Sequence, residues 1–197
     1  MKKAMFVLLL VATAAVAQKK KVESGDYKNL AGVTEFNVEF DYSNIKVAKF
    51  DNEEDFLADK MKKREEKGKD EDFRKNWFAD REARYEPKFI ESFNKRFDDG
   101  SVKADKGLTS AKYTMKVKTE WIQPGYNVGV SRQNAEVTAL VTFFETANPS
   151  NVVLTVRIER SPGAVGMGMD FNSGGRIAES YAKMGKELAN DIRKKAK

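Results

Sequence analysis

The sequence contains no cysteine and no histidine. Without cysteine the chain can form no disulfide and no thiol nucleophile, and we expect no lipid anchor. Without either residue, the common ligands of zinc, copper and haem are missing, and so is the imidazole of a Ser-His-Asp triad. Carboxylates, hydroxyls and basic side chains leave glycosidase-like or oxygen-ligated metal chemistry open, although no motif indicates either. We therefore predict a chain that is not an enzyme and carries no cofactor or metal.

The sequence also lacks a hydrophobic run long enough to span a bilayer, but a shorter one lies at its beginning. Lys2 and Lys3 precede an apolar stretch at residues 5–16, and the small-residue sequence Ala-Val-Ala ends at Ala17. This order is typical of a cleavable export signal, with cleavage between Ala17 and Gln18. We predict a periplasmic or secreted protein, not a lipoprotein, with no transmembrane segment once residues 1–17 are removed.

The formal net charge of +6 includes Lys2 and Lys3, so it falls to about +4 after signal removal. Charges of both signs are interspersed, as on an ordinary protein surface. No arginine-rich run, RNA-binding signature or zinc-finger spacing is present. We expect no nucleic-acid partner.

Hydrophobic periodicity predicts one α+β domain over residues 33–197, preceded by a flexible mature N-terminus at residues 18–32. Alternating apolar residues at 36–40, 113–121 and 152–159 are typical of strands with one buried face. A fuller apolar run at residues 135–145 predicts a more buried strand that forms a hairpin with the next one. We predict a mainly antiparallel, mixed sheet of about four to five strands.

A helical insertion is predicted at about residues 52–97, after the first strand. Asn52 is a helix N-cap, and Pro87 should kink or restart the second helix. Aromatic residues recur at four-residue spacing from Tyr85 to Phe97, which indicates a buried helix face, with sugar stacking as the alternative. A last helix at about residues 176–193 carries an apolar stripe and should pack on the sheet.

Two loops are longer than their connections require, and surplus loop length is often functional. They cover residues 122–132 and 161–175. Because antiparallel strands alternate in direction, both loops should meet at one end of the sheet. The candidate partner-contact residues there are Trp121, Pro124, Gly125, Tyr126, Arg132, Met167, Met169, Asp170, Phe171 and Arg176.

We favour a non-enzymatic, envelope-associated domain that binds an envelope protein or surface component through these loops. The alternative is a binder of, or enzyme on, an anionic small ligand or glycan, held by Arg132, Asp170 and Arg176. The glycine-rich loop opens a helix and could hold an anion, but it matches neither nucleotide fingerprint. A third possibility is self-association through a strand edge or the aromatic helix.

Two segments carry a resemblance: Trp-Ile-Gln-Pro-Gly-Tyr-Asn-Val-Gly at residues 121–129 and Gly-Gly-Arg-Ile-Ala-Glu-Ser-Tyr at residues 174–181. With the order of elements, they resemble small exported proteins of Gram-negative bacteria that have no assigned activity. The architecture is also similar to periplasmic TolB amino-terminal domains and curli-secretion-type lipoprotein domains, although the lipobox cysteine of the lipoprotein members is missing. The resemblance implies a role in the envelope and no catalytic residues.

Overall fold

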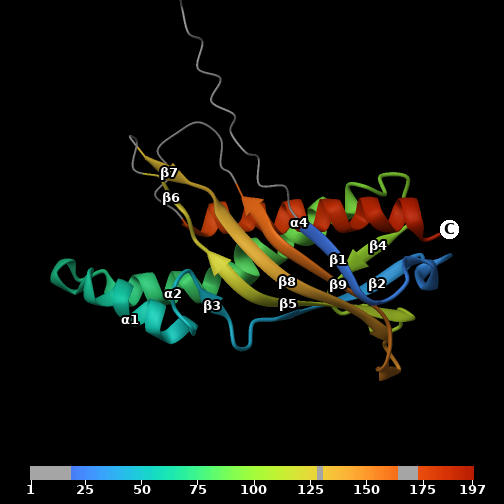
Figure 1. Cartoon of the computed structure of the whole chain (residues 1–197), viewed down its shortest axis with the longest axis horizontal. Helices are drawn as coiled ribbons and strands as arrows, with labels where there is room; N and C mark the ends of the chain where they lie inside the picture. The colour runs from blue at the N-terminus through green and yellow to red at the C-terminus, as the bar shows by residue number, and fades with distance from the viewer. Residues whose placement is uncertain (1–18, 128–130, 164–172) are drawn as a thin grey trace, which may run out of the picture.

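A computed structural model describes residues 19–127, 131–163 and 173–197 and shows an α+β fold (Figure 1). A mixed seven-stranded sheet has the order β1-β9-β8-β5-β2-β4, with β3 paired to β5, and a separate two-stranded sheet joins β6 and β7. The predicted fold class is confirmed. The sheet has more strands than the four to five expected, because the short strands show too little alternation to be recognised in the sequence.

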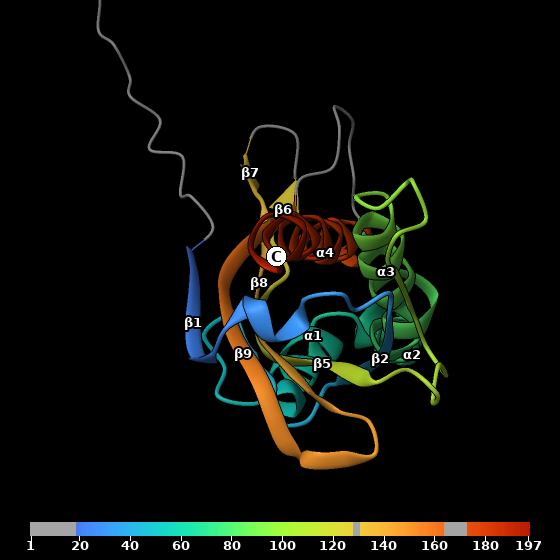
Figure 2. The ribbon, with the colours of Figure 1, turned by 90° about the vertical axis from the view of Figure 1, so that its right-hand side faces the viewer.

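The centre of the sheet is an antiparallel meander of three strands, β5 (Tyr113–Gln123), β8 (Ala135–Glu145) and β9 (Asn148–Gly163). Their inward side chains alternate with half-exposed ones, as in a sheet with one covered face. Helices α3 (Glu86–Asn94) and α4 (Ser173–Lys195) lie over that face (Figure 2). The three-stranded meander and its strand directions are as predicted, although β8 is buried mainly on its helix side.

The N-terminal segment that we expected to be flexible instead forms an edge strand, β1 (Lys19–Gly25), paired antiparallel with β9. A 3-10 turn follows at Tyr27–Leu30 (η1), where both named residues are buried. The Nζ of Lys20 lies 2.6 Å from Asp191 Oδ2 on the last helix. Backbone pairing and this ion pair order the segment. The sequence did not reveal it because an edge strand needs no apolar alternation.

On the other side of β5 the sheet becomes parallel. Strand β2 (Glu35–Asp41) pairs in parallel with β5 and with the short β4 (Lys103–Asp105). The two-residue β3 (Lys46–Val47) also pairs in parallel with the end of β5, at Trp121 and Ile122. The chain therefore passes this end of the sheet just before the helical insertion begins.

The insertion consists of α1 (Glu53–Lys62), a 3-10 turn η2 (Glu65–Lys67), α2 (Asp70–Asp80), a π-helical turn η3 (Arg81–Tyr85) and α3 (Glu86–Asn94). The Asn52 side chain accepts a hydrogen bond from the Asp55 amide at 2.8 Å, so the predicted N-cap is confirmed. Pro87 lies in the first turn of α3, directly after the π-helical turn η3, and the backbone before it is already helical, so the helical hydrogen-bond pattern changes here without a new helix start. Helices α1 and α2 extend beyond one end of the sheet (Figure 1).

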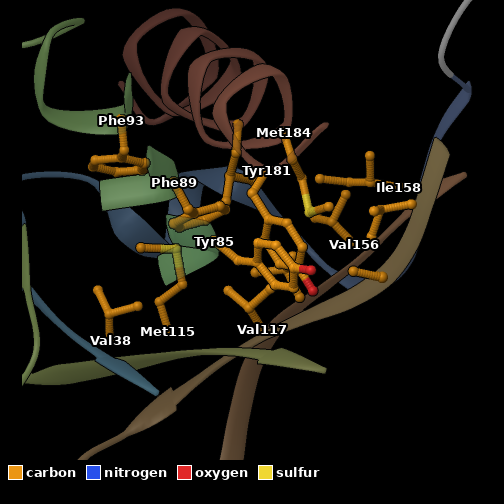
Figure 3. Close-up of a cluster of buried hydrophobic side chains, with 14 of the residues drawn as sticks. Val38, Tyr85, Phe89, Phe93, Met115, Val117, Val156, Ile158, Tyr181 and Met184 are labelled. Atoms are coloured by element: carbon orange, nitrogen blue, oxygen red, sulfur yellow. The ribbon is translucent and has the colours of Figure 1, made fainter. Parts of the chain in front are cut away.

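The aromatic row forms part of the core, as the burial interpretation predicts. Tyr85, Phe89 and Phe93 are at most 2% exposed. The Tyr85 ring stacks on Tyr181 of α4 (Ser173–Lys195) at 5.2 Å between centroids, and Figure 3 shows the two rings side by side between helices and sheet. Helices α3 and α4 also touch at Gly185, where a Cβ would lie 2.4 Å from the Phe89 carbonyl oxygen. The small residues of α4 thus admit α3 at this point.

None of the helices in the described parts of the chain is both long and apolar enough to cross a membrane.

Candidate functional site

A hollow of about 500 Å³ lies at the end of the sheet where β5 ends, between the helical insertion, the β6–β7 hairpin and the first turn of α4. Strands β6 (Tyr126–Asn127) and β7 (Arg132–Gln133) form that hairpin. We call it the loop-end hollow. It is lined by Ala48, Lys49, Phe50, Phe56, Lys60, Arg64, Phe73, Gln123, Pro124, Gly125, Tyr126, Asn127, Gln133, Ser173 and Arg176.

One wall is the turn that follows β5. Gly125 has a φ of 63°, the left-handed value that a Pro-Gly type II turn requires. A Cβ at this position would lie 2.4 Å from the Gln133 carbonyl oxygen, so only glycine allows the returning strand to pass so closely. The turn then presents Tyr126, whose side chain is 44% exposed. It is one of the few large apolar side chains found so exposed in the described residues.

Arg176 on the first turn of α4 joins this wall to the helix. Its Nε donates to the carbonyl oxygen of Pro124 and its Nη2 donates to that of Gly125, both at 3.3 Å. The residue is 6% exposed. The turn at residues 124–125 and the first turn of α4 therefore meet at one end of the sheet, and residues 164–172 of the second predicted loop lie outside the described residues. Because the guanidinium holds backbone carbonyls, its main role is to position the turn.

The opposite wall comes from the insertion and combines aromatic rings with cations. The Nζ of Lys60 lies 5.5 Å from the Phe56 ring centroid, and the guanidinium of Arg64 lies 4.2 Å from that of Phe73. Arg64 also donates from Nη1 to the Lys60 carbonyl oxygen at 2.8 Å, which closes the end of α1. Cation–π contacts and this hydrogen bond hold the basic groups beside an apolar surface.

The loop-end hollow is positively charged. Four basic residues contribute to its wall, and no Asp or Glu is found among its described lining residues. Among these basic residues, Lys60 forms a salt bridge with Asp59 at 3.4 Å, and Asp59 also pairs with Lys63 at 2.9 Å. The hydrogen bond from Lys63, together with Lys60, lowers the pKa of Asp59. Lys49 forms no salt bridge with a described residue, so the hollow retains unpaired positive charge beside its aromatic wall.

Trp121 contributes to the hollow indirectly, through its contact with Ala48. Its indole Nε1 donates to the Ala48 carbonyl oxygen at 3.0 Å, and the Ala48 amide donates to the Ile122 carbonyl oxygen at 2.8 Å. These bonds hold Ala48 at a φ of 54°, an uncommon conformation for a residue with a Cβ. Ala48 lines the hollow and Trp121 does not. Trp121 is thus a positioning residue.

The structure brings together four of the predicted contact residues, Pro124, Gly125, Tyr126 and Arg176, on the wall of one hollow. Arg132 lies in β7 with its side chain exposed and does not line it, which corrects the expectation that Arg132 and Arg176 converge on one ligand. The predicted contacts Met167, Met169, Asp170 and Phe171 lie outside the described residues.

Sequence reasoning missed the wall formed by the insertion and the segment just before it: Lys49, Phe50, Phe56, Lys60, Arg64 and Phe73. Phe56 and Lys60 stand four residues apart on α1, a spacing that can be read from the sequence. On its own, that spacing indicates an ordinary amphipathic helix. The wall becomes visible only when the parallel pairing of β3 with β5 places the insertion beside the 122–132 turn.

The lining groups are suited to holding an anion next to an apolar or aromatic group. The cations provide charge-assisted hydrogen bonds, and the phenylalanine and tyrosine rings provide apolar surface. In the part of the chain that the structure describes, no group of three or more acidic side chains is placed to hold a metal ion.

No protein-family model matches the chain, and neither does any curated protein. Two solved structures are similar, both PelC dodecamers from Paraburkholderia phytofirmans. One, a variant with a single substitution, is 13% identical, with a TM-score of 0.39, over 85% of this chain and 98% of that one. The second is 12% identical, with a TM-score of 0.36, over 85% and 97%. At these TM-scores the likeness carries no argument, and the resemblance to TolB-type and curli-secretion-type domains stays a prediction.

Proposed function

We propose that this chain is an exported, non-enzymatic protein that binds an acidic, partly apolar segment of an envelope protein in its loop-end hollow. The observation that carries the proposal is the composition of the wall: lysine and arginine beside phenylalanine and tyrosine, without a carboxylate among the described lining residues. Such a wall favours an acidic group over a basic one and supplies apolar contact area.

The same wall supports binding over catalysis. General acid–base chemistry near neutral pH needs a group that exchanges a proton there, most often a histidine or a carboxylate of raised pKa. The sequence has no histidine, and the described lining has no carboxylate. The lysines and Arg64 can attract and orient an anion, and the fixed turn at Gly125 gives the hollow a defined shape.

An acidic polypeptide fits better than an anionic glycan, the second candidate. Sugar hydroxyls need acceptors, of which carboxylates are the strongest, whereas Phe50 and Phe73 offer surface for apolar side chains. The exposed ring of Tyr126 lies at the rim, where aromatic residues often anchor protein partners. A short segment with Asp or Glu next to Phe or Leu satisfies both walls.

The test uses defined probes and a matched pair of variants. Blocked ten-residue peptides rich in Asp, Glu, Phe and Leu, their basic counterparts and polyuronate oligosaccharides are titrated against the chain from Gln18 onwards by calorimetry. Lys49→Glu with Arg64→Glu reverses charge in the hollow, and Lys62→Glu with Lys67→Glu reverses charge on exposed lysines of the same insertion that do not line it.

We expect acidic peptides to bind, with a loss of at least about tenfold in affinity for the hollow variant and little change for the control. Preferential binding of the oligosaccharide would show that the ligand of the hollow is a glycan and not a polypeptide. Equal losses in the two variants, or no binding of any acidic probe, would contradict the proposal.

Export is tested separately. Strand β1 starts at Lys19, so cleavage between Ala17 and Gln18 leaves the whole sheet intact. We expect the full chain, expressed in a Gram-negative host, to be recovered outside the cytoplasm with the mass of a protein that begins at Gln18. Recovery of the unprocessed chain in the cytoplasm would contradict the export prediction.

A further inference from the structure

Strand β2 continues beyond the end of its outer neighbour. Strand β4 pairs with β2 only at residues 35–37, whereas β5 pairs with β2 as far as Asp41 on the other side. Over residues 38–41 the outer edge of β2 therefore has no strand partner within the described chain. An unpaired edge of this kind can accept an additional strand.

The direction of the backbone groups along β2 follows from one hydrogen bond. The Lys103 amide donates to the Thr34 carbonyl oxygen at 2.8 Å, so Thr34 faces the outer edge. Since backbone groups alternate between the two sides of a strand, Phe36, Val38 and Phe40 face the same edge. Phe40 lies past the end of β4, and its amide and carbonyl are thus directed outwards, available for pairing.

The edge is held rigidly. The Phe40 ring packs edge-on against Phe89 of α3, with 5.7 Å between centroids, and stacks on Tyr42 at 6.4 Å. On its inner side Phe40 is in register with Val117 of β5. A strand that pairs with this edge would therefore dock on a fixed template, which reduces the entropy lost on binding.

Space is available beside the edge. A groove of about 770 Å³ runs along residues 37–41 of β2 and the following Tyr42, and its far side is formed by Glu82, Glu86 and the turn at Lys106 and Gly107. We call it the edge groove. It shares no lining residue with the loop-end hollow. The two surfaces can therefore be tested independently.

The charge of the edge groove is acidic. Lys106 neutralises Glu86 at 2.5 Å and Lys116 pairs with Asp41 at 3.3 Å. Glu39 and Glu82 also line the groove, and neither forms a salt bridge with a described residue. Two carboxylates thus remain without an ion pair, and a basic occupant would supply the missing charges.

We propose that the edge groove binds an extended, basic peptide segment of a partner protein, which adds a strand to the outer edge of β2. Main-chain hydrogen bonds to Phe40 supply affinity, and lysine or arginine side chains that meet Glu39 and Glu82 supply selectivity. The proposal is independent of the loop-end hollow, which takes a ligand of the opposite charge.

The test uses ¹⁵N-labelled protein and a blocked eight-residue peptide of valine, threonine, lysine and arginine, with basic residues at both odd and even positions so that they lie on both faces of the added strand. Two control peptides have N-methylated backbone amides or acidic residues in place of the basic ones. Glu39→Lys with Glu82→Lys reverses the groove charge, and Glu66→Lys with Glu71→Lys reverses two exposed carboxylates on the insertion that do not line the groove. The readouts are peptide affinity and the hydrogen-exchange rate of the Phe40 amide.

The basic peptide should slow exchange of the Phe40 amide at least about tenfold at saturation, because a paired amide exchanges only when the strand opens. The groove variant should bind it at least about tenfold more weakly, and the control variant should bind it normally. Undiminished binding of the N-methylated peptide, binding that leaves Phe40 unprotected, preference for the acidic peptide or absence of binding would each overturn the proposal.

Discussion

The guanidinium of Arg176 donates to the carbonyl oxygen of Pro124 at 3.3 Å, which ties the first turn of the last helix to the turn that leaves β5. The two residues are far apart in the sequence, and their contact fixes one end of the sheet. The side chain is buried, so the contact is protected from water. The shape of the loop-end hollow depends on it.

Replacement of Arg176 by lysine should destabilise the fold by about 1–3 kcal/mol, because an ammonium cannot reproduce the fork of the guanidinium and leaves buried carbonyls unsatisfied. The exposed Arg132, changed to lysine, should stay within about 0.5 kcal/mol of the parent. Urea unfolding at pH 7 measures both. Equal effects of the two substitutions would contradict a positioning role for Arg176.

Gly125→Ala should be more damaging than Gly100→Ala. Both glycines have positive φ, 63° and 74°, so each substitution costs about 1–2 kcal/mol in backbone strain. Only at Gly125 would the new Cβ collide with backbone, at 2.4 Å from the Gln133 carbonyl oxygen, whereas nothing lies within 4 Å at Gly100. A difference of at least about 1 kcal/mol in unfolding free energy is expected. Equal losses would show that the turn adapts.

Tyr85→Phe and Tyr181→Phe probe two stacked rings with different hydroxyl environments. The Tyr181 hydroxyl lies 2.5 Å from Thr119 Oγ1, but the buried Tyr85 hydroxyl has no hydrogen-bond partner among the described residues. Loss of the Tyr181 hydroxyl should cost about 1 kcal/mol, and loss of the Tyr85 hydroxyl should be neutral or stabilising. Thermal unfolding compares the two. The reverse order would refute this assignment of the hydrogen bond.

Stability should fall in acid partly through Asp191. Burial raises the pKa of this carboxyl, but hydrogen bonds from Lys20 and Lys195 outweigh burial and the pKa lies below its ordinary value. The charged form therefore stabilises the fold above the unfolded pKa of about 3.9, and this contribution is lost as pH falls through the folded value.

Asp191→Asn should accordingly cost about 2 kcal/mol at pH 7, with a difference from the parent that shrinks below about pH 4. Urea unfolding at a series of pH values measures it, with the exposed Asp98→Asn as the control. A constant difference down to pH 3 would contradict this assignment.

The sequence alone predicts those parts of the fold in which apolar residues recur at a regular spacing. The meander and the buried aromatic face of α3 follow from alternation and four-residue spacing. Strand β1 did not, since Lys19–Gly25 pairs through its backbone and leaves its side chains mostly exposed. The parallel partners of β2 were also missed, because parallel pairing of distant segments depends on the whole topology and not on a local pattern.

The candidate site was likewise predicted only in part from the sequence. The 122–132 turn and Arg176 were found from surplus loop length and strand direction. The wall that contains Phe56 and Arg64 was not, since its residues look like an ordinary amphipathic insertion until β3 places them beside Tyr126. Contacts between segments that are distant in the sequence decide which charged residues share a site.

The most direct test of the central claim is a charge-swap titration at the loop-end hollow. Affinities are measured for the parent and for Lys49→Glu with Arg64→Glu, each with an acidic peptide and with the same peptide in which every Asp and Glu is replaced by Lys. We predict that the parent prefers the acidic peptide and the variant prefers the basic one, each by at least about tenfold. If the variant keeps the parent's preference, or if both proteins bind the two peptides equally, the hollow is not where an acidic partner binds.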